Sequence, residues 1–350
     1  ICTPPRPLAR NLDLYPLPDR ALYKRYPSLH RNPHKHVIAG RGCPFDCNYC
    51  HNHLLFKIYG RNCYCLPSQE RVFQEIELIQ AVGKIELLDF ADDTFTAKKT
   101  WLMPFLEEYA SRIKLPFICN IHAKCVSPEI AQALAKAGCW RVCIGVESGS
   151  ERIRKTILGK NISDEELIRA AQLMHQNGIL ILTNNMMGIP TETIDDAWKT
   201  VAINTKMKVD FPWISLLQPF PRTRIEKICR DLGLLDSKET AFNPTFFEES
   251  PIRQSNMKEL VRIQKLFWFA VRFPRFRPLW KLLSKLPITP FLHVLFLLSF
   301  GWRYMKCNRF SLSNMFVFAW QNRHLYVSLP SLFKSSNVIS QDIKPEQEVV

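Results

Sequence analysis

Three closely spaced cysteines are the residues in this chain that most clearly could do chemistry. Cys43, Cys47 and Cys50 lie in the stretch GRGCPFDCNYCHNH, in a C-x3-C-x2-C spacing that directly follows the apolar run HVIAG. A structural zinc ion normally has four protein ligands, so a zinc site would need His51 or His53 as well. A four-iron cluster held by three thiolates would instead keep one iron open to an outside ligand.

Unligated loop thiols are the third interpretation of this triplet. Free cysteines usually pack in apolar positions. These three are interleaved with Arg41, Asp46, Asn48 and His51, which makes that interpretation the least favoured.

The composition indicates an ordinary folded protein with an anionic partner. The chain has 350 residues, of which 47% are hydrophobic and 23% charged, and its formal net charge is +15. Such a charge favours nucleic acid, a membrane surface or an acidic substrate as partner. The twelve cysteines show no regular pairing and no signal peptide precedes them, so we expect a reduced, cytoplasmic protein.

Short apolar runs alternate with helical patterns from about residue 36 onward. Six runs of strand type are separated by amphipathic stretches such as SPEIAQALAKAG, in which Ser127 is the expected N-cap, Pro128 the first helical residue and Gly138 the stop. Strands that alternate with helices pair in parallel. The predicted fold is therefore α/β, either a full or partial barrel or an open doubly wound sheet.

Polar residues gather where four successive strands are expected to end. In parallel α/β folds the carboxyl ends of the strands carry the functional site. Because the cysteine loop also follows a strand, all of these side chains are expected to face one ligand: Asp92, Asp93, Asn120, His122, Glu147, Ser148, Asn184 and Asn185.

The cysteine triplet, with Tyr49 before its last member at the first strand of an α/β barrel, resembles the radical S-adenosylmethionine (radical SAM) superfamily. The resemblance implies that Cys43, Cys47 and Cys50 hold a 4Fe-4S cluster whose open iron chelates S-adenosylmethionine. Reduction of the cluster would then cleave this cofactor to a 5'-deoxyadenosyl radical that abstracts hydrogen from the substrate. A reductant such as ferredoxin or flavodoxin would supply the electron.

The resemblance covers roughly residues 12–235 and extends to the other strands. In LLDFADDTF, the residues Asp92 and Asp93 stand where the superfamily often has Gly-Gly-Glu. The stretch AGCWRVCIGVESGS is similar to the family pattern A-G-x-x-x-V-x-x-G-x-E-S-G and places Glu147 and Ser148 at the fourth strand end. The family places its adenine contact at the position of Tyr49. Together these five residues are expected to line the S-adenosylmethionine pocket, and no catalytic residue is identified.

Two later segments depart from the family pattern. The segments GIPTET and PFPRT resemble a fifth-strand G-x-P-G-E-T and a sixth-strand P-x-P-G-T, but Thr191 and Arg222 replace the glycines. Glycine there would allow a positive φ or a close approach to a ligand. Both turns are therefore expected to differ from those of the family.

The lead-in NLDLYPLPDR resembles a subgroup that carries a cobalamin-binding domain upstream. No D-x-H-x-x-G motif of such a domain occurs in the chain, so the resemblance implies the radical SAM part of an enzyme whose N-terminal cobalamin domain is absent from it. Methyl transfer is the favoured reaction of this subgroup. The alternatives are a radical SAM enzyme that modifies RNA or cyclises its substrate without cobalamin, and a non-catalytic metal or nucleic-acid binding module.

The expected fold is a partial parallel (β/α)6 TIM-like barrel with a helical C-terminal segment, and four regions follow from it. Residues 1–30 are a Pro-rich linker from a missing upstream domain, 31–235 the core barrel, 236–330 a basic, aromatic and apolar helical region, and 331–350 a loose polar tail. Cys63 and Cys65 could bind an auxiliary cluster, but loop thiols are favoured because no further cysteine stands nearby.

The C-terminal region carries much of the positive charge. Between Lys258 and Lys285 it has one Glu, several Lys and Arg, and interleaved aromatics, and residues 288–302 follow without formal charge. The apolar run is too short to span a membrane. It fits either a peripheral membrane contact or a cap over the barrel mouth, and both agree with a small, hydrophobic substrate. Nucleic acid, bound by stacking on these rings, is the less favoured partner.

Overall fold

Six parallel strands form the sheet that positions the cysteine loop. The structure is a computed structural model that describes residues 3–236 and 245–309. The strands pair in consecutive order, each parallel to the next. They are β1 (His34–Val37), β2 (Leu87–Phe90), β3 (Phe117–Ile121), β4 (Cys139–Glu147), β5 (Leu180–Met187) and β6 (Phe211–Leu216). This topology confirms the predicted partial parallel α/β barrel.

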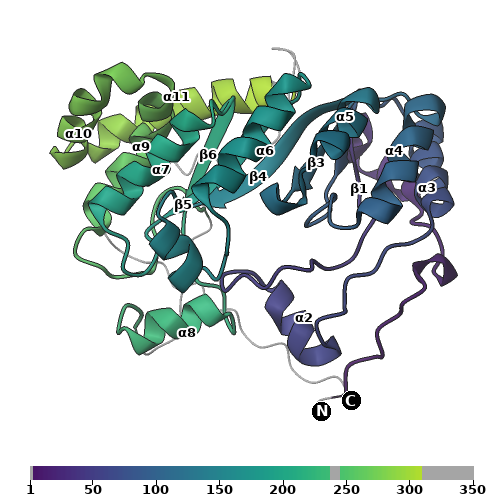
Figure 1. Ribbon diagram of the computed structural model, residues 1–350, viewed down its shortest axis with the longest axis horizontal. Helices are drawn as coiled ribbons and strands as arrows, with labels where there is room; N and C mark the ends of the chain where they lie inside the picture. The colour runs from purple at the N-terminus through teal and green to yellow at the C-terminus, as the bar shows by residue number, and fades with distance from the viewer. Residues whose placement is uncertain (1–2, 237–244, 310–350) are drawn as a thin grey trace. The chain divides into compact units, whose positions relative to one another are not determined.

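Helices follow the strands and cover one face of the sheet (Figure 1). The α-helices are α1 (Pro27–Arg31), α2 (Asn52–Tyr59), α3 (Gln69–Val82), α4 (Lys99–Arg112), α5 (Pro128–Lys136), α6 (Asp164–Gln176), α7 (Ile194–Lys206), α8 (Arg224–Asp231), α9 (Met257–Arg272), α10 (Arg277–Lys285) and α11 (Thr289–Cys307). Short 3-10 helices are η1 (Leu12–Leu14), η2 (Arg20–Arg25), η3 (Ala123–Cys125) and η5 (Pro274–Phe276), and η4 (Ile153–Ile157) is a π-helix.

Local sequence explains where these helices begin. The hydroxyl of Ser127 accepts a hydrogen bond from the amide of Ile130, and Pro128 is the first residue of α5, as expected. Ser163 and Thr193 cap α6 and α7 in capping boxes with carboxylates three residues later. These caps satisfy amides that would otherwise lack partners, and so they fix the loops at the strand ends.

The main core lies between the sheet and helices α3 to α6. An aromatic cluster dominates its first half, where the ring of Phe90 stacks on Phe95 at 4.5 Å and meets Phe117 edge-on at 5.4 Å. Each fully buried Phe contributes about 2 kcal/mol to folding through burial alone. The packing keeps β2 and β3 rigid beneath the loops that follow them.

The N-terminal segment lies against α3 rather than running free. The amide of Ser68 donates to Asp13 at 2.9 Å, Arg71 donates to the carbonyl of Tyr15 at 2.7 Å, and Arg20 pairs with Glu75. The segment expected to be a linker is therefore tied to the barrel at these residues.

The helical C-terminal region begins on the same sheet. Leu260, Ile263 and Phe267 of α9 are buried in a second core with Trp198 of α7 and Ile214 of β6. Residues 1–300 form one compact unit, and a second begins at Gly301 within α11. No described helix is long and apolar enough to cross a membrane. The tail predicted for residues 331–350 lies outside the described residues.

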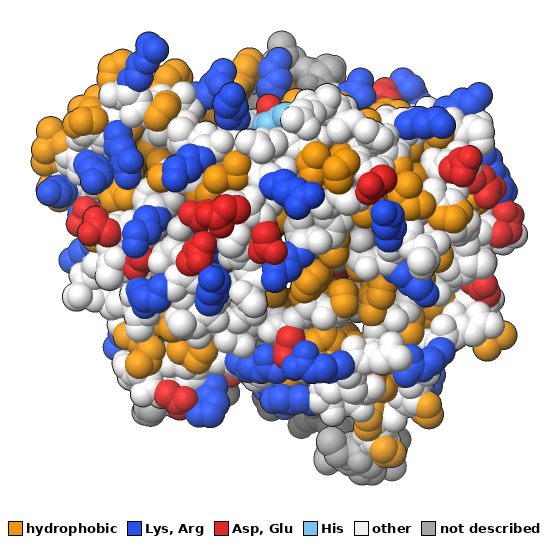
Figure 2. Space-filling model, in the orientation of Figure 1, with side chains coloured by type: hydrophobic (Ala, Val, Ile, Leu, Met, Phe, Trp, Pro, Cys, Tyr) orange, Lys and Arg blue, Asp and Glu red, His pale blue; other side chains and the backbone are white. Residues whose placement is uncertain are grey.

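The surface reflects the net charge of the chain. Figure 2 shows Lys and Arg side chains spread widely over one face, with fewer Asp and Glu among them. Exposed hydrophobic side chains gather in Figure 2 where Figure 1 places α10.

Candidate functional site

A cavity of about 240 Å³ lies where the strands end. Most of the predicted site residues line it: Cys43, Cys47, Tyr49, Cys50, Asp93 and Glu147. Asn120 and His122 from the end of β3 and Asn184 from β5 line it as well. The structure thus brings together side chains up to 141 positions apart in the sequence (Cys43 to Asn184), as the parallel topology predicts.

The three thiols of the triplet are half-buried and free. The Thr94 hydroxyl lies 3.4 Å from the sulfur of Cys43, and the side-chain amide of Asn52 donates to the sulfur of Cys50 at 3.4 Å. Burial raises the pKa of the Cys47 thiol to about 11. Binding of iron would therefore have to displace a proton from this thiol.

The donor set fits a cluster better than a single ion. Among the described residues, no three His, Cys, Asp or Glu side chains converge on a point that could hold one metal ion. A polynuclear cluster does not need such convergence, because each iron takes one thiolate and the inorganic sulfides fill the centre. Three thiols on one cavity wall are compatible with that arrangement.

Glu147 enters the cavity because β4 ends irregularly. The register between β4 and β5 shifts between Gly145 and Glu147, and Glu147 has a φ of 67°. A left-handed backbone costs a residue with a side chain roughly 1–2 kcal/mol. This strain turns the carboxylate from the strand toward the cysteine loop.

The carboxylate of Glu147 is shared by two partners inside the site. Its Oε1 accepts a hydrogen bond from the Tyr49 hydroxyl at 3.0 Å and forms an ion pair with the Nζ of Lys160 at 3.0 Å. Both charged side chains are buried. A Cβ atom on Gly145 would lie 2.2 Å from Oε1 and 2.6 Å from Nζ, so only glycine leaves room for the pair.

The two adjacent aspartates have different surroundings. Asp93 lines the cavity and accepts a hydrogen bond from Asn52 at 3.0 Å. Asp92 is buried, accepts from the amides of Ala39 and Gly40, and does not line the cavity. Burial raises the pKa of Asp92 to about 6 despite these hydrogen bonds. Asp92 therefore anchors the start of the cysteine loop.

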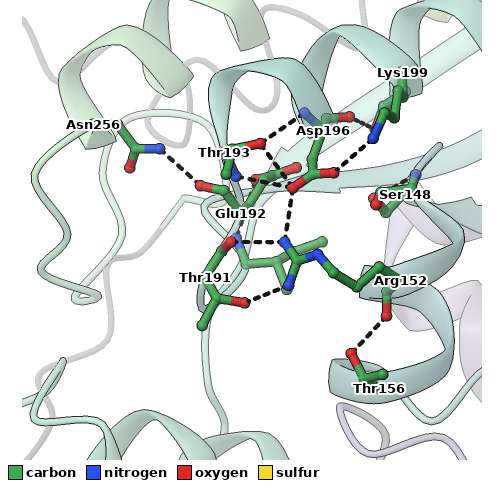
Figure 3. A network of polar contacts seen from close by, with 12 residues as sticks. Ser148, Arg152, Thr156, Thr191, Glu192, Thr193, Asp196, Lys199 and Asn256 are labelled. Atoms are coloured by element: carbon green, nitrogen blue, oxygen red, sulfur yellow. Dashed lines mark hydrogen bonds and ion pairs between the residues drawn. The ribbon is translucent and has the colours of Figure 1, made fainter.

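Ser148 is fully buried behind the cavity and belongs to a network that joins the ends of β4 and β5 (Figure 3). Its hydroxyl accepts from the amide of Ser150 at 3.2 Å. Nearby, Arg152 donates to the carbonyl of Thr191 at 3.0 Å and pairs with Asp196 at 2.8 Å. The structure thus places Ser148 among framework contacts.

The two turns in which Thr191 and Arg222 stand in place of glycine both have a left-handed backbone. Thr191 has a φ of 64° and Arg222 one of 65°, both in the left-handed region that glycine would favour. The contacts of Arg152 hold Thr191 in place, and the amide of Arg222 donates to Glu226 at 2.7 Å. Side-chain contacts thus accompany, at both residues, a positive φ that glycine would adopt more readily.

The loop after β6 closes on the cysteine loop. Arg224 at the start of α8 pairs with Asp46 at 2.8 Å, and the amide of Ile225 donates to the carbonyl of Asn48 at 3.0 Å. Figure 1 shows α2 and α8 on the same side of the sheet. The first and last strands of the barrel are thus joined through the cysteine loop.

Several residues of the site were not found from the sequence. Lys160, Thr94 and Phe45 line the cavity but stand in no recognisable pattern. Phe45 stacks on His122 with 3.7 Å between ring centroids, and burial lowers the pKa of His122 to about 3. This histidine is therefore neutral at physiological pH.

The described cysteines outside the triplet take no part in a group of three metal-ligating side chains. Cys63 and Cys65 are buried, and Cys65 pairs with Arg41 in an isolated antiparallel bridge. No disulfide joins the cysteines that the structure describes. The interpretation of Cys63 and Cys65 as loop thiols stays a prediction.

Comparison with known proteins adds a family match. Residues 37–202 match the model of the radical SAM superfamily. An uncharacterized methyltransferase from Pyrococcus horikoshii is 30% identical over 225 residues, which cover 63% of this chain and 48% of that protein. A bacteriochlorophyllide d C-12(1)-methyltransferase from Chlorobaculum tepidum is 25% identical over 190 residues, covering 53% and 41%.

A solved structure shares the fold. The radical S-adenosylmethionine methyltransferase TsrM from Kitasatospora setae, with cobalamin and a [4Fe-4S] cluster bound, superposes with a TM-score of 0.51 at 21% identity. The match covers 59% of this chain and 41% of that one. The chain thus spans less than half the length of each of these three relatives.

Proposed function

We propose that the chain belongs to the radical SAM superfamily, whose model matches residues 37–202, and that it is an enzyme that binds a 4Fe-4S cluster and S-adenosylmethionine. The observation that carries the proposal is the cavity itself, where the three free thiols of Cys43, Cys47 and Cys50 meet polar side chains from the other strand ends. When bound in this site, the cluster and S-adenosylmethionine would supply radical chemistry, that is, reductive cleavage of S-adenosylmethionine for hydrogen abstraction from a substrate.

The protein's part is to hold and orient these groups. Cys43, Cys47 and Cys50 would hold the cluster, with Thr94 and Asn52 beside two of the sulfurs as hydrogen-bonding partners. Such hydrogen bonds restrict the position of each thiolate and stabilise its charge. The contacts of Asp92 with Ala39 and Gly40 fix where the loop leaves β1.

Polar groups at the strand ends would orient the S-adenosylmethionine. Asp93 and Glu147 offer carboxylates and Lys160 an ammonium group, which suit the amino and carboxylate ends of an amino acid. We propose that Tyr49 acts through its hydrogen bond to Glu147 as well as through its ring. Asp92 and Ser148 contribute from behind the cavity wall rather than from its surface.

We propose methyl transfer to a small, hydrophobic molecule as the activity of the whole protein. All three relatives bear methyltransferase names, one of them for a bacteriochlorophyllide, and the similar solved structure contains cobalamin. Cobalamin is therefore proposed as a further cofactor of the whole protein. A ferredoxin or flavodoxin is the proposed electron donor.

A peripheral contact with the membrane from the cytoplasmic side is proposed for the C-terminal helices. Exposed apolar side chains and cations occur together on α10 and its flanks. This arrangement would keep the enzyme near a hydrophobic substrate.

The test is cleavage of S-adenosylmethionine by protein reconstituted anaerobically with iron and sulfide. With dithionite as reductant, the protein should release 5'-deoxyadenosine and methionine, and the Cys47→Ala variant should release neither. Cys125→Ala is the matched control, because this thiol lies outside the triplet, and the variant should keep the activity. Unchanged cleavage by Cys47→Ala would exclude the ligand assignment.

A further inference from the structure

The short helix α10 presents an exposed apolar face. Leu279 and Leu282 are 44% and 56% exposed, and their spacing of three residues puts them on one side of the helix, while Leu286 directly after the helix is 39% exposed. Phe273 and Phe276 just before the helix are also exposed, at 44% and 56%. Single exposed hydrophobic residues are common on proteins, but a continuous run of this kind usually marks an interaction surface.

The opposite side of α10 is fixed to α9. Ser284 is fully buried, its hydroxyl lies 3.3 Å from a carboxylate oxygen of Glu259, and its carbonyl accepts from Arg262 at 2.5 Å. The indole of Trp280 donates to the carbonyl of Phe273 at 3.0 Å. These bonds hold the helix in one orientation, so its leucines remain exposed.

Cations flank the exposed leucines and phenylalanines. Arg272, Arg275, Arg277, Lys281 and Lys285 are all exposed. No Asp or Glu stands between Glu259 and Phe300 in the sequence, so the segment itself has no carboxylate to neutralise them. Figure 2 shows hydrophobic side chains and Lys and Arg side chains interspersed where Figure 1 places α10.

We propose that residues 272–286 form a docking face for a membrane surface rich in anionic lipid. This inference rests on the peripheral membrane contact proposed above. It assigns that contact to one face of the protein and to anionic lipid. The leucines and phenylalanines would enter the boundary between headgroups and acyl chains, while Arg and Lys reach the lipid phosphates with their long side chains.

The chemistry of this face fits other partners less well. A second copy of the chain would bring the same cations against each other, which opposes symmetric pairing through this face. Single-stranded nucleic acid could stack its bases on the rings of Phe273 and Phe276, but it would leave the three exposed leucines without an apolar partner. An anionic lipid surface satisfies the charges and the aliphatic side chains together.

The test is sedimentation of the full chain with vesicles, without S-adenosylmethionine or reductant. Binding to vesicles of equal parts phosphatidylglycerol and phosphatidylcholine is expected, with loss on raising the salt concentration and at least about ten-fold weaker binding to phosphatidylcholine alone. Leu279→Glu/Leu282→Glu should lower the binding by roughly ten-fold or more. Leu78→Glu is the matched control, since this leucine of α3 is 42% exposed and lies outside the face.

Each other outcome overturns the inference in a distinct way. If wild type binds and the double variant binds equally, a membrane contact exists but this face does not make it. If the wild-type chain does not bind anionic vesicles, the proposed peripheral membrane contact is wrong. A dimer in solution that the double variant abolishes, or competition by single-stranded RNA with no vesicle binding, would assign the face to those partners. The Cys47→Ala variant should bind vesicles like wild type, which separates this test from the catalytic proposal.

Discussion

Lys160 and Glu147 form a buried ion pair in the cavity. Their side chains are only 6% and 9% exposed, and one oxygen of Glu147 serves both Lys160 and Tyr49. Taking away one member of a buried pair leaves the other charge without compensation, which typically costs about 3 kcal/mol or more. The pair is therefore a structural requirement of the site as well as part of its lining.

We expect Lys160→Met to lower the free energy of unfolding by about 3 kcal/mol, measured by urea denaturation of the chain without cluster. The double variant Glu147→Gln/Lys160→Met should lose less than the sum of the two single changes. Lys155→Met is the matched control, because the ion pair of Lys155 with Glu151 is exposed. Its loss should lower the free energy of unfolding by less than about 1 kcal/mol. Equal losses for Lys160→Met and Lys155→Met would contradict the account of a buried charge pair.

The sequence indicated those cavity-lining residues whose spacing is visible, and it did not indicate those that only the fold brings to the cavity. The cysteine triplet, Asp93 and Glu147 could be found because each follows an apolar run at a strand end. Lys160 reaches the cavity from beyond the π-helix η4, thirteen residues after Glu147, and no periodicity indicates that route. Asp92 and Ser148 were correctly placed at strand ends, but a one-residue difference in position decides which side chain faces the cavity.

At the scale of elements, the turn between β5 and α7 contains a buried carboxyl group that titrates unusually. Glu192 accepts hydrogen bonds from the amides of Gly188 and Ile189, and its other oxygen is buried with no hydrogen-bond partner. Burial raises the pKa of Glu192 to about 8 from its ordinary 4.5. The same turn contains Thr191, and helix α7 directly after it contains Asp196, both of the network in Figure 3.

This carboxyl should make the fold less stable as the pH rises. Because its pKa is higher in the folded state, its stabilising contribution is complete below about pH 4.5 and is lost as the pH rises toward 8. Glu192→Gln keeps an oxygen for both amides and cannot ionise. We expect the variant to gain free energy of unfolding relative to wild type between these pH values, by up to about 1.4 kcal/mol per pH unit.

The measurement is a series of urea unfolding curves from pH 5 to 8.5 for wild type and Glu192→Gln. Glu107→Gln is the control, because this side chain is exposed on α4 and its substitution should leave the pH profile unchanged. A constant difference between Glu192→Gln and wild type across the range would show that Glu192 does not titrate in it.

The observed helices and strands agree with those predicted from the sequence where local packing and helix caps determine them. Helix α5 begins at Pro128 after its predicted cap Ser127, and the six strands appear in the predicted order. Helix α2 was not predicted, since its residues show no clear pattern beyond the cysteine loop. The left-handed turns at Thr191 and Arg222 were also missed, because tertiary contacts maintain a conformation that local preference opposes.

At the scale of the whole molecule, two surfaces of different chemistry serve one proposed enzyme. The cavity at the strand ends gathers thiols and carboxylates, whereas the face at residues 272–286 gathers cations and apolar side chains. The net charge of +15 could be read from the sequence, but its position on an exposed face could not, since that depends on how α10 is bonded to α9. Both surfaces belong to the compact unit of residues 1–300.

The most direct test of the central claim is iron and sulfide analysis of anaerobically reconstituted protein, with electron paramagnetic resonance of the dithionite-reduced sample before and after S-adenosylmethionine is added. We predict about four irons and four sulfides per chain, as a 4Fe-4S cluster requires, and a signal that changes on addition because the cofactor binds the open iron. Zinc in place of iron, or a full cluster whose signal does not respond to S-adenosylmethionine, would contradict the account.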